Sequence, residues 1–330
     1  MTSILVFSDG ELIGDGLIKL PLLAGLRAAW PEARIAWATG VKSIYARALQ
    51  PVAGQLLDEV FENIWPQLEL PALLWRRPLD GRRFDIVIDT QMRLHRLLRL
   101  RRIAHDRYYS SCAGYRFSAA RPESPAPPGG PVLDRLYQLA SLAGRPVTPG
   151  AVPPAPGEWA QAAAALLPPG PRYVGLAPGA GGKDKCWPRE QYLELGQRLA
   201  GLGFVPVLLL GPQEADWVPW FRAGLPSALF PEWDRTDPWP QATGPLLVMA
   251  LARRLCAAVA NDAGTAHMLA AGGAPLVSLL ADRRKMAKFR PAARQLRMLA
   301  ADQWGSGMAA IPLDEVLAAV LQLSDAKEDE

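Results

Sequence analysis

One stretch near the C-terminal end of the chain, Ala258 to Gly272, constrains the fold more than any other. It predicts the end of an apolar strand, a tight turn at Asn261 to Gly264 and a helix from Thr265 to Ala271, because Asn, Asp and Gly tolerate the backbone angles of a reversal. Such a helix directs its unpaired N–H groups and the positive end of its dipole at the edge of the sheet. That edge is therefore a candidate site for a phosphate.

Three polar side chains of this stretch, Asp262, Thr265 and His267, are candidates to hold a hydroxyl, an oxygen or a developing charge. The alternative is an ordinary α/β domain in which Asp262 caps the helix and His267 lies in the core with its hydrogen bonds satisfied. The stretch alone leaves both interpretations open, since helix N-termini are common and phosphate sites are rarer.

Apolar strands alternate with amphipathic helices along the chain. Near the N-terminus, a strand at Ile4 to Phe7 precedes a helix that opens at Asp15, and the next strand is Arg34 to Ala38. Phe84 to Asp89 is a later, fully buried strand. The alternation predicts an α/β architecture with parallel, doubly wound sheets. Asp15 then lies just beyond the end of the first strand, either as a general base or as a helix N-cap.

Length and composition indicate two domains and a reducing compartment. A chain of 330 residues is long for one domain. The proline-rich stretch Pro146 to Gly157 predicts a linker, so that the domains are 1–157 and 158–330. The three cysteines lie far apart without a CxxC pair, which argues against a disulfide framework or a zinc site. We expect neither a secretory signal nor a membrane span.

The net charge of +4 is unevenly placed. Arginines interleaved with leucines predict one helix with a buried face and a basic face, and these arginines are Arg93, Arg96, Arg99, Arg101, Arg102 and Arg107. Such a face is usually only solvated. The alternative is that Arg93 and Arg96 bind a phosphorylated or carboxylated acceptor at a membrane face. Nucleic acid is not expected as a partner, because no aromatic-interleaved patch or known binding module accompanies the charge.

The first strand of the second half runs into a loop rich in glycine and lysine, Pro178 to Pro188. The loop matches neither the P-loop pattern nor GxGxxG. Even so, Gly181 would let the backbone approach an anion, and Lys183 or Lys185 would add a mobile positive charge. The alternative is a flexible surface loop with Trp187 as a packing anchor.

Two further segments complete the second half. Glu214 follows a strand predicted at Phe204 to Leu210, and it could accept hydrogen bonds from a ribose or be only a solvated acid. A closing helix is predicted at Asp314 to Leu323, and the charged tail Ser324 to Glu330 is expected to be disordered.

Five motifs in a fixed order span nearly the whole chain. They are Ile13-Gly-Asp15 with Leu20-Pro-Leu-Leu23, Phe84-Asp-Ile-Val-Ile-Asp89, Ala177-Pro-Gly179 with Lys185-Cys-Trp-Pro188, Leu209-Leu-Gly-Pro-Gln-Glu214, and Asn261-Asp-Ala-Gly-Thr-Ala-His267 with Ala270-Ala and Ala274-Pro275. Lys-x-Trp-Pro followed by Asn-Asp-x-Gly-x-x-His is the most specific part of this series. Together the motifs resemble glycosyltransferase family 9, the bacterial heptosyltransferases that build the lipopolysaccharide core.

The resemblance implies a GT-B fold, with two doubly wound Rossmann-like domains facing a cleft. The acceptor belongs to the N-terminal domain, and the nucleotide-sugar to the C-terminal one. It implies an inverting transfer that needs no metal or other cofactor, from a nucleotide-diphospho-sugar such as ADP-heptose. The acceptor is a lipid-linked or phosphorylated glycan of the lipopolysaccharide core or a related surface glycan. A cytoplasmic protein with peripheral contact to the inner membrane is expected.

The resemblance also implies roles for individual residues. Asp15 matches the proposed base that takes the proton of the acceptor hydroxyl. Lys185 matches the residue that balances diphosphate charge as the glycosidic bond breaks, and Glu214 roughly matches a ribose or base contact. The residues that match the loop around the donor's phosphates and sugar are Asp262, Gly264, Thr265 and His267.

The chain departs from the family pattern at three places. Ala263 stands where Ser or Thr is usual, and Ala281 to Lys285 replaces the usual Gly-Pro-Thr. The first loop, Phe7 to Gly14, is more acidic than usual and would repel an acidic acceptor unless the arginines offset it. These departures leave open a catalytically inactive GT-B binding protein in envelope glycan assembly. A sugar-nucleotide epimerase or a dehydrogenase on a two-domain Rossmann scaffold is a weaker alternative, and the missing GxGxxG argues against the dehydrogenase.

Overall fold

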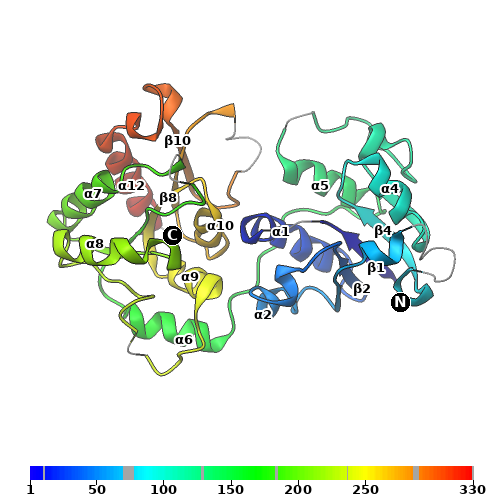
Figure 1. Ribbon diagram of the computed structural model, residues 1–330, viewed down its shortest axis with the longest axis horizontal. Helices are drawn as coiled ribbons and strands as arrows, with labels where there is room; N and C mark the ends of the chain where they lie inside the picture. Colours follow the sequence, from blue (N-terminus) through cyan, green and yellow to red (C-terminus); the bar gives the residue numbers. More distant parts are fainter. Residues whose placement is uncertain are drawn as a thin grey trace. The chain divides into compact units, whose positions relative to one another are not determined.

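The computed structural model describes residues 1–9, 12–69, 78–127, 130–182, 185–235, 237–284 and 290–328. The chain divides into two compact units, Met1–Pro153 and Pro154–Glu330 (Figure 1). The division falls within the proline-rich stretch that suggested a linker, a few residues before the expected boundary at residue 157.

The sheet of the N-terminal unit has five parallel strands in the order β3-β2-β1-β4-β5. These strands are β1 (Ser3–Phe7), β2 (Arg34–Ala38), β3 (Glu59–Phe61), β4 (Arg83–Asp89) and β5 (Ala104–Ser110). The central strand β1 is an apolar run, Ile4 to Phe7, because a parallel strand is buried on both faces. The strand order reverses between β1 and β4, and folds of this class bind ligands outside the carboxyl ends of the strands at such a point.

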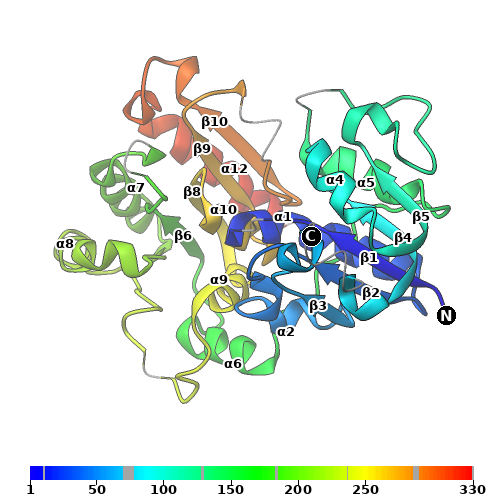
Figure 2. The ribbon, with the colours of Figure 1, turned by 45° about the vertical axis from the view of Figure 1, so that its right-hand side comes forward.

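Helices accompany the strands of this unit, and Figure 2 shows α4 and α5 beside β4 and β5. The helices are α1 (Ile13–Ala29), α2 (Gln50–Ala53), α4 (Leu94–Leu100) and α5 (Val132–Ser141). Short 3₁₀ turns occur at Ile44–Ala46, Trp65–Leu68, Pro78–Gly81 and Cys112–Tyr115.

Two local expectations for this unit, for Asp15 and for Arg107, are corrected by the structure. Helix α1 begins before Asp15, so Asp15 lies in its first turn, and the N-cap position belongs to Leu12. The same helix contains Pro21 well inside it, where the proline removes one helical hydrogen bond. The arginine-rich helix ends at Leu100, and Arg107 lies on β5. Aromatic residues such as Tyr108 favour a strand there.

The sheet of the C-terminal unit also has five parallel strands, in the order β10-β9-β8-β6-β7. These strands are β6 (Tyr173–Ala177), β7 (Val205–Leu208), β8 (Leu255–Asn261), β9 (Leu276–Leu280) and β10 (Leu296–Ala300). Leu229 forms an isolated parallel bridge to Val207 beside β7. With Leu229 in the place of a third strand, both units follow the same order around their first strand. The expected doubly wound fold class is therefore confirmed.

Helices cover both faces of the second sheet. They are α6 (Gly157–Leu166), α7 (Arg189–Gly201), α8 (Val218–Gly224), α9 (Gly244–Ala252), α10 (Gly264–Ala271) and α12 (Leu313–Glu328), with 3₁₀ turns at Pro212–Trp217, Ala301–Gln303 and Met308–Ala310. Helices α7 and α12 share one apolar core with Val174, Val259 and Val277 of the sheet. The tail expected to be disordered from Ser324 instead continues α12 to Glu328. Within the described residues, no helix is long and apolar enough to cross a membrane.

A fully buried polar side chain ends the strand that follows the switch point in each sheet. In the N-terminal unit this residue is Asp89, at the end of β4. Its carboxylate accepts hydrogen bonds from the Tyr108 hydroxyl at 2.8 Å, the Ser110 hydroxyl at 3.3 Å and the backbone N–H of Gln91 at 2.9 Å. Burial raises the pKa of Asp89 to about 6, and these hydrogen bonds oppose the shift only in part.

The equivalent residue of the C-terminal unit is Asn261, at the end of β8. Its Oδ1 accepts hydrogen bonds from the backbone N–H of Trp187 at 3.0 Å and the Tyr192 hydroxyl at 3.2 Å. Its Nδ2 donates to the carbonyl of Pro178 at 2.8 Å. The indole N–H of Trp187 donates to the carbonyl of Ile311 at 3.1 Å. One buried amide therefore fixes both ends of the loop that follows β6.

Replacing Asn261 with Leu should destabilise the C-terminal unit. The apolar side chain would leave the Trp187 N–H and the Pro178 carbonyl buried without partners, and each such group costs roughly 1–3 kcal/mol. We expect the free energy of unfolding, measured with denaturant, to fall by about 2–4 kcal/mol. The control is Ser278→Ala on β9, because the buried hydroxyl of Ser278 makes no hydrogen bond within the described residues. Equal stability of the two variants would contradict the role of Asn261.

Replacing Asp89 with Asn should change how stability depends on pH. The pKa of Asp89 in the folded protein, about 6, lies above the value of about 4 in an unfolded chain. The free energy of unfolding therefore falls as the pH rises above about 4, because the buried carboxyl resists ionisation. Asp89→Asn has no such loss. The stability of the wild type relative to the variant should therefore fall by roughly 3 kcal/mol between pH 4 and pH 7 in denaturant unfolding. A difference that is independent of pH would refute this explanation.

Candidate functional site

The carboxyl edge of the second sheet carries most of the residues that the sequence predicted for a donor. Helix α10 starts at Gly264, directly after the turn that follows β8. Its N-cap is Ala263, which has no side-chain oxygen to bind the first N–H groups, so Asp262 does not cap the helix. Asp262 and Thr265 are partly exposed at this end, and His267 is buried. The N–H of Ala266 donates to the carbonyl of Ala263 at 3.1 Å, so the N–H groups of Gly264 and Thr265 are the ones that remain available to an anion.

The loop after β6 brings Lys185 to the same edge. Asn261 ties Pro178 and Trp187 to the end of β8, and Lys185 lies between them with an exposed side chain. Gly181 is exposed, and a side chain there would meet no atom within 4 Å, so its backbone is open to a ligand. Lys183 lies outside the described residues. Trp187 is the predicted packing anchor, and it fixes the end of the loop that carries Lys185.

Glu214 lies against the backbone at the end of β6. It sits in the 3₁₀ turn after β7, and its carboxylate occupies the space that a side chain at Gly179 would need. Glycine at 179 therefore allows this approach. Burial is the main cause that raises the pKa of Glu214 above its usual value. Glu214 thus belongs to the edge that carries Lys185 and Asp262.

Two residues at this edge were missed from the sequence, Glu232 and Trp233. The indole N–H of Trp233 donates to the carbonyl of Leu210, after β7, at 2.9 Å, while 38% of Trp233 stays exposed. Burial, with a contribution from the nearby charge of Glu214, raises the pKa of Glu232 to about 7, although Arg235 opposes the shift. The signal was a polar and aromatic pair directly after the short apolar run that ends at Phe230.

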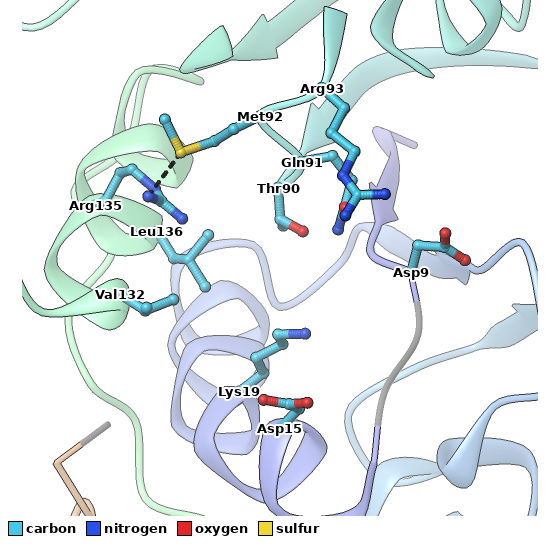
Figure 3. A pocket seen from close by; sticks show the side chains of 10 residues that line it. All are labelled: Asp9, Asp15, Lys19, Thr90, Gln91, Met92, Arg93, Val132, Arg135 and Leu136. Atoms are coloured by element: carbon cyan, nitrogen blue, oxygen red, sulfur yellow. Dashed lines mark hydrogen bonds between the residues drawn. The ribbon is translucent and has the colours of Figure 1, made fainter. Parts of the chain in front are cut away.

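A pocket of about 330 Å³ lies in the N-terminal unit, outside the carboxyl ends of β1 and β4 (Figure 3). Helix α1 contributes Asp15 and Lys19, one helical turn apart. The remaining lining residues are Asp9, Thr90, Gln91, Met92, Arg93, Val132, Arg135 and Leu136. The pocket therefore joins the candidate base Asp15 with three positively charged side chains. It is where a doubly wound sheet places its ligands.

Asp9 and Arg96 form an internal ion pair beside this pocket. The carboxylate of Asp9 is almost fully buried and accepts hydrogen bonds from the backbone N–H of Gly40, the Trp65 indole and the Arg96 guanidinium, the last at 2.5 Å. Arg96 also lies over the Trp65 ring. Arg93 thus lines the pocket and Arg96 does not. The negative charge of Asp9 in the first loop is therefore offset by an arginine, as the sequence suggested.

Lys19 and Arg135 were not predicted as site residues. The amine of Lys19 donates to the hydroxyl of Ser8 at 2.7 Å, and its spacing of four from Asp15 could have identified it. The guanidinium of Arg135 donates to the sulfur of Met92 at 2.9 Å, and burial lowers its pKa. Nothing in the local sequence of α5 distinguishes Arg135. Among the described residues, no group of three or more His, Cys, Asp or Glu side chains is placed to hold a metal ion.

The basic loop after Leu280 is less positive than its sequence suggests. Arg283 pairs with Asp302 at 3.3 Å, and Arg284 pairs with Asp282 at 2.9 Å. Lys285, the last residue of this departure from the family pattern, lies outside the described residues. The two arginines are therefore already balanced by neighbouring carboxylates.

The comparisons with known proteins agree with this geometry. The sequence model of glycosyltransferase family 9 (heptosyltransferase) matches residues 73–308. Among solved structures, a family 9 glycosyl transferase from Veillonella parvula DSM 2008 is 15% identical with a TM-score of 0.73, and the match covers 98% of both chains. The E. coli ADP-heptose lps heptosyltransferase II is 19% identical with a TM-score of 0.68, covering 99% of this chain and 100% of that one.

A third structure, E. coli heptosyltransferase WaaC with ADP, is 18% identical with a TM-score of 0.66, covering 98% of this chain and 100% of that one. No curated protein matches the sequence. At these identities the structures establish the fold, while the family model spans well over half of the chain. The chain therefore belongs to glycosyltransferase family 9, the heptosyltransferases, and is a glycosyltransferase with a GT-B fold.

Proposed function

We propose that this glycosyltransferase transfers heptose from ADP-heptose, with inversion and without a metal ion, to a lipopolysaccharide-core or related surface glycan. The pocket around Asp15 carries this proposal, because it combines a carboxylate with three cations at the switch point of the N-terminal sheet. E. coli heptosyltransferase WaaC has been solved with ADP and with ADP-2-deoxy-2-fluoro heptose, which supports an ADP-linked donor.

The diphosphate of the donor would bind at the start of α10. The uncapped N–H groups of the helix supply partial positive charge, and exposed Lys185 supplies a full one. Gly181 and Lys183 would complete the anion site from the loop after β6. Gly264 lets the phosphate approach the backbone closely.

The sugar and the nucleoside would extend to either side of the diphosphate. Asp262, Thr265 and His267 are the candidates to hold the heptose. Glu214 would accept hydrogen bonds from the ribose. Trp233 offers the base an exposed aromatic face, which its hydrogen bond to the backbone after β7 holds in one orientation.

The acceptor would bind in the pocket of the N-terminal unit. Arg93 would hold its phosphate or carboxylate, and Asp15 would take the proton from its hydroxyl. The guanidinium of Arg96 is already engaged by Asp9 and the Trp65 ring. Arg96 would therefore help to bind the acceptor indirectly, by holding Asp9 and Trp65 in place.

The proposed chemistry is a single displacement. The acceptor oxygen loses its proton to Asp15 and forms a bond to the anomeric carbon of the heptose. The bond from that carbon to the diphosphate oxygen breaks on the opposite face, and ADP leaves with the electron pair. Lys185 and the N–H groups of α10 stabilise the charge that develops on the leaving group.

The location that fits this acceptor is the cytoplasmic face of the inner membrane, with peripheral contact. A catalytically inactive binding protein remains the alternative, which the altered loop after Leu280 suggested. Arg283 and Arg284 of that loop pair with carboxylates, which weakens the argument for the alternative.

Calorimetric titration with nucleotides tests the donor. We expect ADP to bind more tightly than UDP, GDP or CMP, and Lys185→Ala to weaken ADP binding by about tenfold or more, because a charge-assisted contact is lost. The control is Lys42→Ala, another exposed lysine, in the N-terminal unit. A preference for UDP or GDP would change the donor. No binding by folded protein would contradict a nucleotide-sugar enzyme.

The same titration tests the nucleoside contact. Trp233→Ala should weaken ADP binding, and Trp304→Ala is a matched control, because both indoles are 38% exposed in the same unit. Equal affinities of the two variants would remove Trp233 from the site.

Asp15→Asn tests the base. It should lower kcat by roughly 10²–10⁴-fold, the usual contribution of general base catalysis, with little change in the Kd for ADP. Glu32→Gln, an exposed carboxylate of the same unit, is the control. A loss confined to substrate affinity would contradict a base role. Binding of ADP without transfer to any acceptor by the wild type would favour the inactive binding protein.

A further inference from the structure

Helix α4 carries four leucines, of which two are buried and two are exposed to solvent. Leu97 and Leu100 face the core, whereas Leu94 is 47% exposed and Leu98 is 53% exposed. Leu94 and Leu98 are four residues apart, so they lie on one side of the helix, one above the other. Met92, just before the helix, is 55% exposed. Three large apolar side chains therefore project from one short segment.

Arginines border this apolar stripe. The exposed ones are Arg93, Arg99, Arg101 and Arg102. Within the described part of the chain, no carboxylate forms an ion pair with any of these four. Arg96 is the exception on the helix, since it turns inward to Asp9. We name the α4 patch as Met92, Arg93, Leu94, Leu98, Arg99, Arg101 and Arg102.

The chemistry of the α4 patch fits the surface of an anionic membrane. Leucine and methionine enter the boundary between headgroups and acyl chains, and unpaired arginines attract acidic headgroups at the same level. A nucleic acid would use the arginines but would leave the leucines in water. Simple solvation accounts for the arginines but not for three exposed apolar side chains beside them. We infer that the α4 patch docks the N-terminal unit onto an anionic lipid surface.

The α4 patch is continuous with the pocket around Asp15. Met92 and Arg93 belong to both. If the proposed function holds, a glycan acceptor with a lipid anchor would keep its anchor in the bilayer under the patch. Its hydroxyl would then need to travel only from Met92 and Arg93 to Asp15. The patch thus explains how a protein with no membrane-spanning helix among its described residues could act on a lipid-linked acceptor.

Vesicle flotation of the full chain tests this inference. Wild type should float with vesicles of phosphatidylcholine containing about one third phosphatidylglycerol, and not with phosphatidylcholine alone, and binding should weaken as salt rises. The double variant Leu94→Ser/Leu98→Ser should bind at least about tenfold more weakly at every salt concentration. Arg99→Gln/Arg102→Gln should also bind more weakly, with a reduced dependence on salt. Inorganic phosphate at equal ionic strength should not release the protein.

The control variant is Leu202→Ser/Arg253→Gln, which replaces an exposed leucine and an exposed arginine of the C-terminal unit. Patch variants that float like the control would overturn the inference. So would a wild type that ignores anionic vesicles, or one that is a dimer dissociated by Leu94→Ser/Leu98→Ser, because the patch would then be a protein interface.

Transfer assays separate this inference from the proposed function. With a water-soluble acceptor lacking its lipid, the patch variants should keep the wild-type rate. With the acceptor in vesicles, their KM should rise while kcat is retained. Flotation without any transfer would uphold the patch and contradict the proposed function. Transfer to the acceptor in vesicles with the same KM for the patch variants and the control would uphold the proposed function and contradict the patch.

Discussion

The side-chain amide of Asn261 holds together three segments at the carboxyl edge of the second sheet, where we propose that the donor binds. It accepts from the Trp187 N–H and the Tyr192 hydroxyl and donates to the Pro178 carbonyl, all in a fully buried position. The amide both accepts and donates there, whereas a carboxylate would repel the carbonyl and an alkyl group would leave both partners unpaired. The loop that carries Lys185 is therefore positioned by the residue that precedes Asp262. One set of hydrogen bonds therefore positions both halves of the proposed anion site, the loop after β6 and the turn after β8.

The N-terminal unit uses a different solution at the same point of the same topology. Asp89 ends β4 as Asn261 ends β8, but its carboxylate accepts only, so it gathers donors from β5 and from its own loop and cannot bind a carbonyl of the loop after β1. That loop is tied by Asp9 instead, through Gly40, Trp65 and Arg96. The carboxylate pins the loop to β2 and α4 and leaves the space over β1 and β4 open. A loop fixed by hydrogen bonds in one unit and an open pocket in the other would suit the diphosphate and the larger acceptor that we propose.

The architecture and much of the candidate site could be predicted from the sequence, because both rest on local patterns. Apolar runs identify parallel strands, and small residues after a strand indicate a turn into a helix, which placed Asp15 and Asp262 beyond strand ends. Lys19 could have been predicted from its spacing to Asp15 on α1, whereas Arg135, Glu232 and Trp233 could not, because long-range packing brings these three to the sheet edges. Arg135 comes from a helix more than a hundred residues after α1, and Trp233 depends on an isolated bridge at Leu229 that has no strand-like length. Arg96 shows the opposite case. The sequence suggested that it binds the acceptor, but its guanidinium pairs with Asp9 of a loop that is distant in sequence.

The charge balance of the pocket bears on the kind of acceptor it admits. Of its two carboxylates, Asp9 is neutralised by Arg96, so Asp15 remains with Lys19, Arg93 and Arg135. If the acceptor binds there as proposed, a neutral glycan would remove water from the guanidinium groups of Arg93 and Arg135 without giving them an anionic partner, which is costly. A glycan with a phosphate or carboxylate near the reacting hydroxyl would compensate them while its hydroxyl meets Asp15. The acidic first loop, which the sequence suggested would repel such an acceptor, instead contributes the carboxylate that holds Arg96 in place. Under the proposed function, the preference for an anionic acceptor would therefore depend on the arginines that line the pocket, Arg93 and Arg135, and not on the total charge of the arginine-rich segment.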